Sequence, residues 1–220
     1  MTNEKLVLAY CIAGNISEVK LPRSGVEGAA VRWIASGVLR CLASDFGRRM
    51  PDAPVPEMVK EFSQVLQSIF EQTVIIPFRF PTIVESDEVL HGFIEARSAE
   101  YGAALRRLHN KVQMDVRITA GRAERSQSRA QSGKDYLETR RAEQQQLQSV
   151  LAEFRRVSGS LAEAWVRRDT PSGIRAFALV DRGVLEDLLK ELGRLHMPPE
   201  VSARITGPWP PSEFVETAHE

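Results

Sequence analysis

Residues 112–118, with the sequence VQMDVRI, carry the clearest strand pattern in the chain. Four apolar side chains alternate there with three polar ones, Gln113, Asp115 and Arg117. Because side chains alternate between the two faces of a strand, this pattern predicts one buried face and one face in contact with water. Any fold of this chain therefore contains a sheet with one apolar face.

Further apolar runs predict strands on both sides of this one. They are bounded by residues rich in Gly, Pro, Asn and Ser, which favour turns. Pro77 lies inside one of them and has no backbone N–H, so we expect that strand at a sheet edge or at a bulge. The predicted strands cover residues 5–13, 36–43, 73–80, 174–180 and 201–206.

Helical spacing of apolar side chains predicts four helices, and Ser86 is suited to cap the second of them. The third is long, and its first half is polar on nearly all sides, so we expect that half in solvent. Three prolines, Pro208, Pro210 and Pro211, predict irregular structure over residues 207–216. The predicted helices cover residues 57–71, 86–108, 134–167 and 183–193.

The order of these elements indicates the fold class. Strands and helices are mixed without the regular βαβα alternation of a parallel sheet, which predicts an α+β protein. The second half of the chain is expected to run strand, long helix, strand, helix, strand.

Composition excludes several classes of protein. The 220 residues carry 29 basic and 29 acidic side chains, so the chain is not a generally basic nucleic-acid binder. The longest apolar run, Leu6 to Ala13, is too short to cross a membrane, so we expect a cytoplasmic chain without membrane contact. Cys11 and Cys41 are too few for a disulfide framework and are expected to be buried, reduced thiols.

Motifs for catalysis and cofactor binding are missing from the sequence. The four histidines lack metal-ligand spacing, and there is no phosphate-binding glycine loop and no G-x-S-x-G turn. We therefore predict no enzymatic activity, no metal and no cofactor. A ligand-binding or catalytic alternative would rest on Glu95, Asp115 and Arg117, although Asp115 and Arg117 are also explained as a surface pair on one strand.

Two segments rich in proline and aromatic residues are candidates for partner binding. One is IIPFRFPT, residues 75–82, and the other is GPWPP, residues 207–211, followed by Phe214. A tryptophan between prolines is rigid and buries a large area at low entropic cost. Alternatively, the tryptophan fills the core of its own domain and the two phenylalanines share one strand face. The candidate contact residues are Phe78, Phe80, Pro81, Trp209 and Phe214.

The same segments resemble those of a known family. The ending GPWPPSEFV is similar to the G-P-W-P-P-Y-S-F-V ending of the gas vesicle GvpL/GvpF family, and TVIIPFRFPTIVES resembles its V-L-P-F-R-F-G-T-V segment. SGKDYLETR, IRAFALVDR and the opening LVLAYCIAG follow the family in the same order. The sequence departs from the family pattern at Pro81, which replaces a glycine, at Gln113, which replaces a glutamate, and at Ser212-Glu213, which replaces Tyr-Ser.

The resemblance implies a fold and a function. It implies an N-terminal α+β domain (1–109), a C-terminal modified ferredoxin-like domain with a long helix (110–208) and a tail (209–220) that packs on the protein. It also implies an accessory protein of gas vesicle formation that binds the hydrophobic shell protein GvpA and other accessory proteins, without enzymatic activity or cofactor. A general interaction scaffold of the same fold, docking through the polar helix 134–146, remains the alternative.

Overall fold

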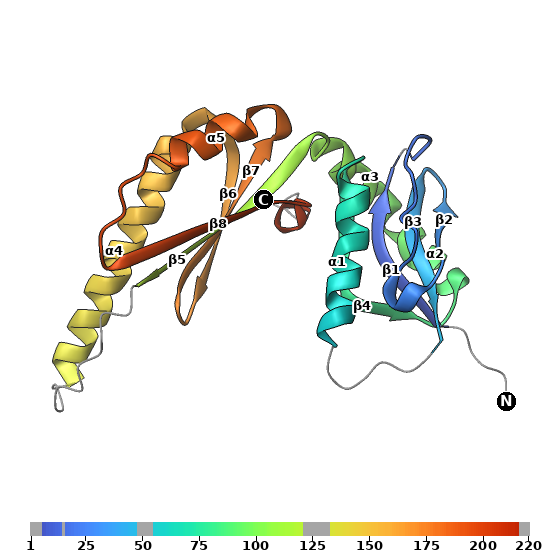
Figure 1. Ribbon diagram of the computed structural model, residues 1–220, viewed down its shortest axis with the longest axis horizontal. Coiled ribbons are helices and arrows are strands. Elements are labelled where there is room, and N and C mark those ends of the chain that lie inside the picture. Colours follow the sequence, from blue (N-terminus) through green and yellow to red (C-terminus); the bar gives the residue numbers. More distant parts are fainter. Residues whose placement is uncertain (1–5, 15, 48–54, 121–132, 216–220) are drawn as a thin grey trace. The chain divides into compact units, whose positions relative to one another are not determined.

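The computed structural model describes residues 6–14, 16–47, 55–120 and 133–215, with side chains in the last segment from Leu137 on. Contacts within the chain define two compact units (Figure 1). The first unit holds the chain up to Asn110 together with the segment from Pro210 on, and the second unit runs from Lys111 to Trp209. No helix in this described part of the chain is long and apolar enough to cross a membrane.

The first unit is built on an antiparallel sheet with the strand order β2-β3-β1-β4. Its strands are β1 (Leu6–Ala13), β2 (Val31–Ser36), β3 (Leu39–Phe46) and β4 (Ile75–Val84). β2 was not predicted, because the short segment VRWIAS has neither a continuous apolar run nor a clean alternation. β2 forms a hairpin with β3, in which Ser36 pairs with Leu39.

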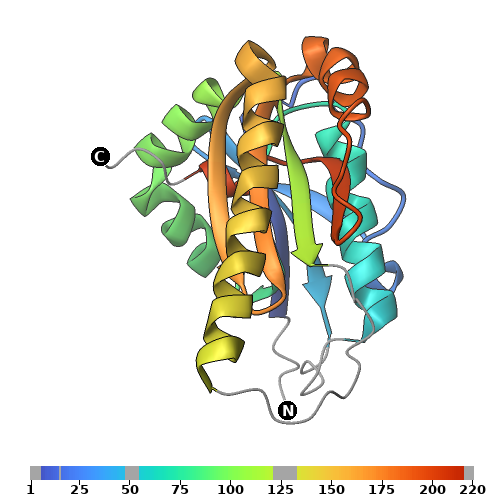
Figure 2. The same ribbon diagram turned by 90° about the vertical axis from the view of Figure 1, so that its left-hand side faces the viewer.

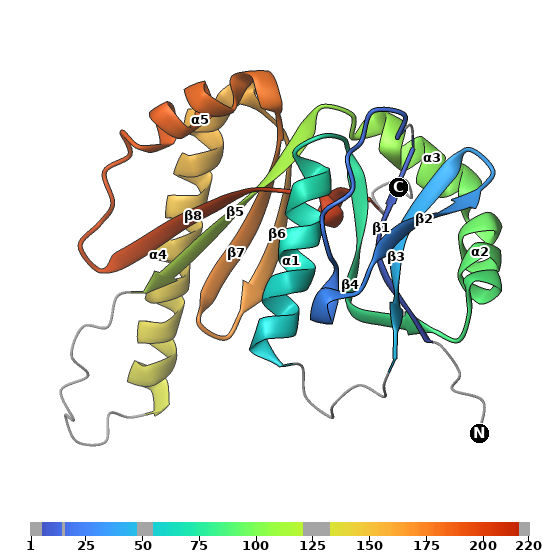
Figure 3. The ribbon, with the colours of Figure 1, turned by 45° about the vertical axis from the view of Figure 1, so that its right-hand side comes forward.

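Helices cover both faces of this first sheet. α1 (Pro56–Phe70) lies on one side, and α2 (Asp87–Ala96) and α3 (Ser98–Arg107) lie on the other (Figure 3). On the α1 side, Tyr10 of β1 stacks on Phe62 with ring centroids 5.0 Å apart. Because both faces are covered, β1 is buried along almost its whole length, which explains its continuous apolar run.

The predicted helix 86–108 is two helices in the structure. Its start is confirmed, since the Ser86 side chain accepts a hydrogen bond from the N–H of Val89. The helix is interrupted at Arg97, whose φ of −119° and ψ of 19° are not helical. The Arg97 guanidinium then donates to Glu100 and to the Tyr101 hydroxyl, which ties the break to the first turn of α3.

The second unit has the element order βαββαβ and the antiparallel strand order β6-β7-β5-β8. This is the ferredoxin-like arrangement, and together with the first unit it confirms the predicted α+β class and the long helix. α4 packs on one face of the sheet (Figure 2). The elements are β5 (Lys111–Ala120), α4 (Gly133–Ser158), β6 (Ala162–Thr170), β7 (Gly173–Asp181), α5 (Leu185–Leu192) and β8 (Val201–Trp209).

The prediction that the long helix extends to residue 167 is wrong. α4 ends at Ser158 and is followed by Gly159, whose φ of 47° lies in the left-handed region that commonly ends helices. A 3-10 turn over Gly159–Leu161 leads into β6, so Trp165 lies on a strand. Its ring faces α4, with the Arg155 guanidinium 5.9 Å from the ring centroid.

Residues 207–209 were predicted to be irregular, but they continue β8. Gln113 pairs with Trp209 and Asp115 with Thr206, so β8 carries one extra residue at this point. Such a bulge tolerates Pro208, and β8 is an edge strand of its sheet. Gly207 has a φ of 131°, and a side chain there would meet the Gln113 carbonyl at 2.9 Å.

The polar side of β5 is not the open, wet face that the alternation predicted. Gln113 and Asp115 are each only 5% exposed, and of the three polar residues only Arg117 is exposed. A close cationic partner on the neighbouring strand, described below, compensates for the cost of burying the Asp115 carboxylate.

Cys11 on β1 and Cys41 on β3 are buried and free, as expected. Burial raises the pKa of both thiols, because desolvation disfavours the thiolate. We therefore expect neither thiol to react with Ellman's reagent near pH 8 in the folded protein, and both to react after denaturation. Rapid reaction of one thiol in the folded protein would contradict this burial.

The same raised pKa values give stability a pH dependence. The folded state holds both thiol protons more tightly than the unfolded chain, so this contribution is fully present below the unfolded pKa of about 8.5. The free energy of unfolding is expected to fall as the pH rises above that value.

Candidate functional site

The proline-rich segment of β4 forms a bulge of four residues. Ala9 of β1 pairs with Thr82 and Cys11 pairs with Pro77, so residues 78–81 leave the ladder opposite Tyr10. The Thr82 hydroxyl donates to the carbonyl of Arg79 at 2.7 Å and closes the bulge on itself. The expectation that Pro77 lies at an edge or a bulge is confirmed, since β4 is an edge strand and the bulge begins directly after Pro77.

The bulge sends its two phenylalanines to opposite sides of the sheet. Phe80 contacts Phe62 of α1, with ring centroids 5.0 Å apart. Phe78 packs against the core beneath α2 and α3, and its ring lies 6.2 Å from that of Phe93. The expectation that Phe78 and Phe80 share one strand face is therefore wrong, because residues in a bulge do not follow the alternation of a regular strand.

α2 carries two large, exposed apolar side chains, and one of them, Phe93, lies next to Phe78. Val89 is 49% exposed and Phe93 is 45% exposed, and their spacing of four residues places them on the same side of the helix. We call Phe78, Val89 and Phe93 the docking patch. The sequence analysis missed Val89 and Phe93. Each immediately precedes a member of the buried stripe, Leu90 or Ile94, and this apolar pair outside the stripe is the signal that marks them.

Trp209 ends β8 in the second unit and is 44% exposed. Its indole N–H donates to the Thr206 hydroxyl at 3.3 Å. Its ring is therefore not part of the buried core, which is the alternative that the sequence left open.

Phe214 has a different environment. It lies in a short 3-10 turn, Ser212–Phe214, and is only 1% exposed. Its carbonyl accepts a hydrogen bond of 2.6 Å from the Arg107 guanidinium of α3, and Val215 packs against the core of the first unit. Phe214 thus anchors the segment after Trp209 and presents almost no surface of its own.

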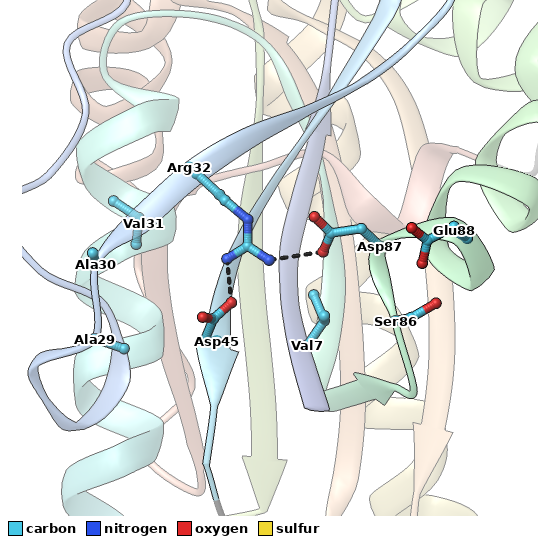
Figure 4. A pocket seen from close by; sticks show the side chains of 9 residues that line it. All are labelled: Val7, Ala29, Ala30, Val31, Arg32, Asp45, Ser86, Asp87 and Glu88. Atoms are coloured by element: carbon cyan, nitrogen blue, oxygen red, sulfur yellow. Dashed lines mark hydrogen bonds and ion pairs between the residues drawn. The ribbon is translucent and has the colours of Figure 1, made fainter. Parts of the chain in front are cut away.

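An open depression of about 670 Å³ lies beside β2 and the start of α2 (Figure 4). At its centre the Arg32 guanidinium binds Asp45 of β3 at 2.6 Å and Asp87 of α2 at 2.7 Å. Ser86, also in its lining, caps α2. These charged groups bind one another. We therefore interpret them as a structural ion-pair network that connects β2, β3 and α2, and not as a ligand-binding site.

Glu95 has a partner of its own, whereas Asp115 and Arg117 lie near each other. Glu95 lies 3.4 Å from the His91 ring on the surface of α2. Asp115 accepts hydrogen bonds from Arg175 at 2.6 and 3.0 Å, and Arg117 lies 3.9 Å from it. The Asp115–Arg117 pair therefore exists, but the main partner of Asp115 is Arg175.

The two-unit α+β fold is that of a class of gas vesicle proteins. The crystal structure of the gas vesicle protein GvpF from Anabaena sp. PCC7120 is 15% identical, with 98% of each chain covered and a TM-score of 0.78. The crystal structure of GvpF from Microcystis aeruginosa is 12% identical, with 97% of this chain and 99% of that chain covered and a TM-score of 0.76. No curated protein matches the chain.

The sequence gives the family directly. The family model described as gas vesicle synthesis protein GvpL/GvpF matches residues 6–216. The chain belongs to this GvpL/GvpF family, which confirms the resemblance seen in the sequence. The family consists of structural or accessory gas vesicle proteins, and membership supports a role in gas vesicles.

Proposed function

We propose that this chain is a non-enzymatic accessory or minor structural protein of gas vesicle assembly. It acts in the cytoplasm, where it binds the hydrophobic shell protein GvpA and other accessory proteins during early vesicle formation. The observation that carries the proposal is the docking patch, an apolar cluster in which Val89 and Phe93 are about half exposed, in a member of a gas vesicle family. A shell protein that is apolar before it joins its lattice needs such a surface to stay soluble.

The structure favours docking through side chains over strand addition at β4. A partner strand needs a regular row of N–H and C=O groups at the edge. Pro77 and Pro81 remove two N–H donors from β4, and the bulge at residues 78–81 interrupts its regular geometry. In this proposal Phe80 and Pro81 shape the bulge, and the bulge presents Phe78 beside Val89 and Phe93.

Trp209 is the proposed contact of the second unit. Tryptophan is enriched among the residues that dominate binding energies, because its large ring buries much area at low entropic cost. At 44% exposure this ring keeps surface available for a partner. Phe214 contributes indirectly, because it holds the segment that follows Trp209.

Co-expression with a GvpA-type shell protein tests the proposal. We expect a soluble complex by affinity capture and size exclusion, and about tenfold or greater weakening of capture in Phe93→Ser and in Trp209→Ala. Val38→Ser is the matched control, because Val38 is 83% exposed in the turn between β2 and β3, outside both contacts. All three variants are expected to keep a melting temperature close to that of the parent protein.

Two results would overturn the proposal. One is a shell protein that stays insoluble while this chain elutes alone. The other is equal capture by the parent protein, Phe93→Ser and Trp209→Ala. A sharply lower melting temperature in Trp209→Ala would show instead that Trp209 stabilises the fold, and would remove it from the proposed contacts.

A further inference from the structure

The docking patch extends along the exposed face of α2. Gly92 and Ala96 lie next to Val89 and Phe93 at helical spacing, and all four residues are exposed. Val89 and Ala96 are seven residues apart, so this apolar stripe is roughly 10 Å long. A stripe of this length matches about two turns of a partner helix.

Gly92, in the middle of the stripe, is not required by the fold of α2. Glycine is less favourable in a helix interior than every residue except proline. Apart from its chain neighbours and the backbone of its own helix, a Cβ atom at Gly92 would meet no atom of the described chain within 4 Å. A missing side chain allows another backbone to approach the helix closely. Gly92 therefore indicates a partner that packs closely on this face.

Two glutamates border the stripe on the side of α2 that faces β2. Glu88 and Glu95 are exposed and lie seven residues apart, which places them on one side of the helix. His91 lies between them, and its ring is 3.0 Å from the Ala35 carbonyl of β2. α2 contains no lysine and no arginine, so its exposed face is apolar with one acidic border.

The arginines around α2 do not neutralise this border. Arg32 and Arg97 form ion pairs with other carboxylates, and Arg40 donates to two backbone carbonyls of its own hairpin. Arg79 is exposed in the bulge of β4, which adjoins the opposite border of the stripe. The His91 ring lies 3.4 Å from Glu95 but leaves this glutamate side chain 72% exposed.

Helix stability accounts for one of the two glutamates. Glu88 lies in the first turn of α2, where a negative charge is favourable for the helix dipole. Glu95 lies in the last turn, where a negative charge is unfavourable. A basic group of a bound partner would compensate for this cost.

We propose that the exposed face of α2 binds an amphipathic helix of a partner protein, with an apolar stripe and a basic flank. The inference rests on the proposed function, because it names the kind of segment that the docking patch binds. The apolar stripe of the partner packs on Val89, Gly92 and Phe93. Two basic residues seven positions apart on its flank match the separation of Glu88 and Glu95.

Other occupants match this face less well. A second copy that packs α2 against α2 offers no basic flank, since α2 has no lysine or arginine. A membrane with anionic lipids attracts basic surfaces, whereas the border of this face is acidic. Charge complementarity therefore favours a basic amphipathic helix.

Fluorescence anisotropy with the full-length protein tests the inference. The probe is a labelled helical peptide of about 18 residues, with leucines at helical spacing on one face and lysines beside them. The control peptide carries glutamates in place of the lysines. At low salt we expect the lysine peptide to bind about tenfold more tightly than the control, and added salt to reduce the difference.

Variants of α2 locate the binding. Glu88→Gln and Glu95→Gln are each expected to weaken binding of the lysine peptide about threefold, and the double variant about tenfold. Gly92→Leu is expected to raise the melting temperature, because leucine favours helix, and to weaken binding about tenfold, because its side chain holds the partner away. Glu57→Gln is the matched control, because Glu57 is exposed in the first turn of α1, on the other face of the sheet.

Several results would overturn the inference. They are equal binding of the two peptides, unchanged binding in the double variant or in Gly92→Leu, and a dimer of the parent protein that Phe93→Ser abolishes. If the lysine peptide does not bind but the shell protein is still captured through Phe93, this inference fails and the proposed function stands. If the peptide binds through α2 but the shell protein is not captured, the helix-binding face stands and the proposed function fails.

Discussion

Phe214→Ala is expected to lower the free energy of unfolding of the first unit by about 3–5 kcal/mol. Phe214 is 1% exposed, so its removal loses the transfer energy of a whole ring and leaves a cavity. The anchor also includes the hydrogen bond of 2.6 Å from Arg107 to the Phe214 carbonyl, which loses its fixed position when the ring is gone. Chemical denaturation of the variant and the parent protein measures the loss.

Trp209→Ala is the control for this prediction. It removes a larger aromatic ring from the same part of the sequence, but Trp209 is 44% exposed, so we expect a loss within about 1 kcal/mol. Hydrogen exchange followed by mass spectrometry should place the loss of protection in Phe214→Ala within the first unit. A loss of under about 1 kcal/mol in Phe214→Ala would contradict the anchoring of this segment in the core.

Local signals predicted much of the fold. The apolar run of β1 and the helical stripe of α1 gave the right elements in the right places. Ser86 marked the start of α2, because a capping side chain and the N–H that it binds are close in sequence. Such signals are contained within a few residues and do not depend on the rest of the fold.

The incorrect predictions arose where local and long-range preferences disagree. Leu161 and Trp165 continue the apolar spacing of α4, so β6 was interpreted as a helix, although Gly159 was available as a stop signal. Residues 207–209 include Pro208, but the edge position of β8 and its bulge accommodate this proline within the strand. In both cases pairing with a neighbouring strand outweighed the preference of the segment itself.

The candidate sites were only partly predictable. The sequence pointed to the segment of Phe78 and to Trp209, but the bulge that separates Phe78 from Phe80 depends on the register with β1. The partner of Asp115 was not predicted either. Asp115 and Arg175 lie on two strands that are distant in sequence, and only the register between those strands brings them together.

Asp115→Asn is expected to lower the free energy of unfolding of the second unit by about 2–3 kcal/mol. Asp115 is 5% exposed and accepts hydrogen bonds of 2.6, 3.0 and 3.1 Å from Arg175. The amide keeps the size of the side chain but removes the negative charge that lies beside Arg175 and Arg117. Asp169→Asn is the control, because Asp169 is 62% exposed in its pair with Arg167, and we expect a loss within about 0.5 kcal/mol.

The salt dependence of Asp115→Asn distinguishes lost charge balance from lost packing. If Arg175 and Arg117 repel one another once the carboxylate is gone, added salt screens that repulsion, and the melting temperature of the variant should rise more steeply with salt than that of the parent protein. Replacing Arg204, which lies opposite Arg117 on β8, by glutamine in the Asp115→Asn background should recover part of the stability, because it removes one of the repelling charges. If neither salt nor Arg204→Gln restores stability, repulsion between these arginines is not the cause, and the lost hydrogen bonds to Arg175 account for the whole effect.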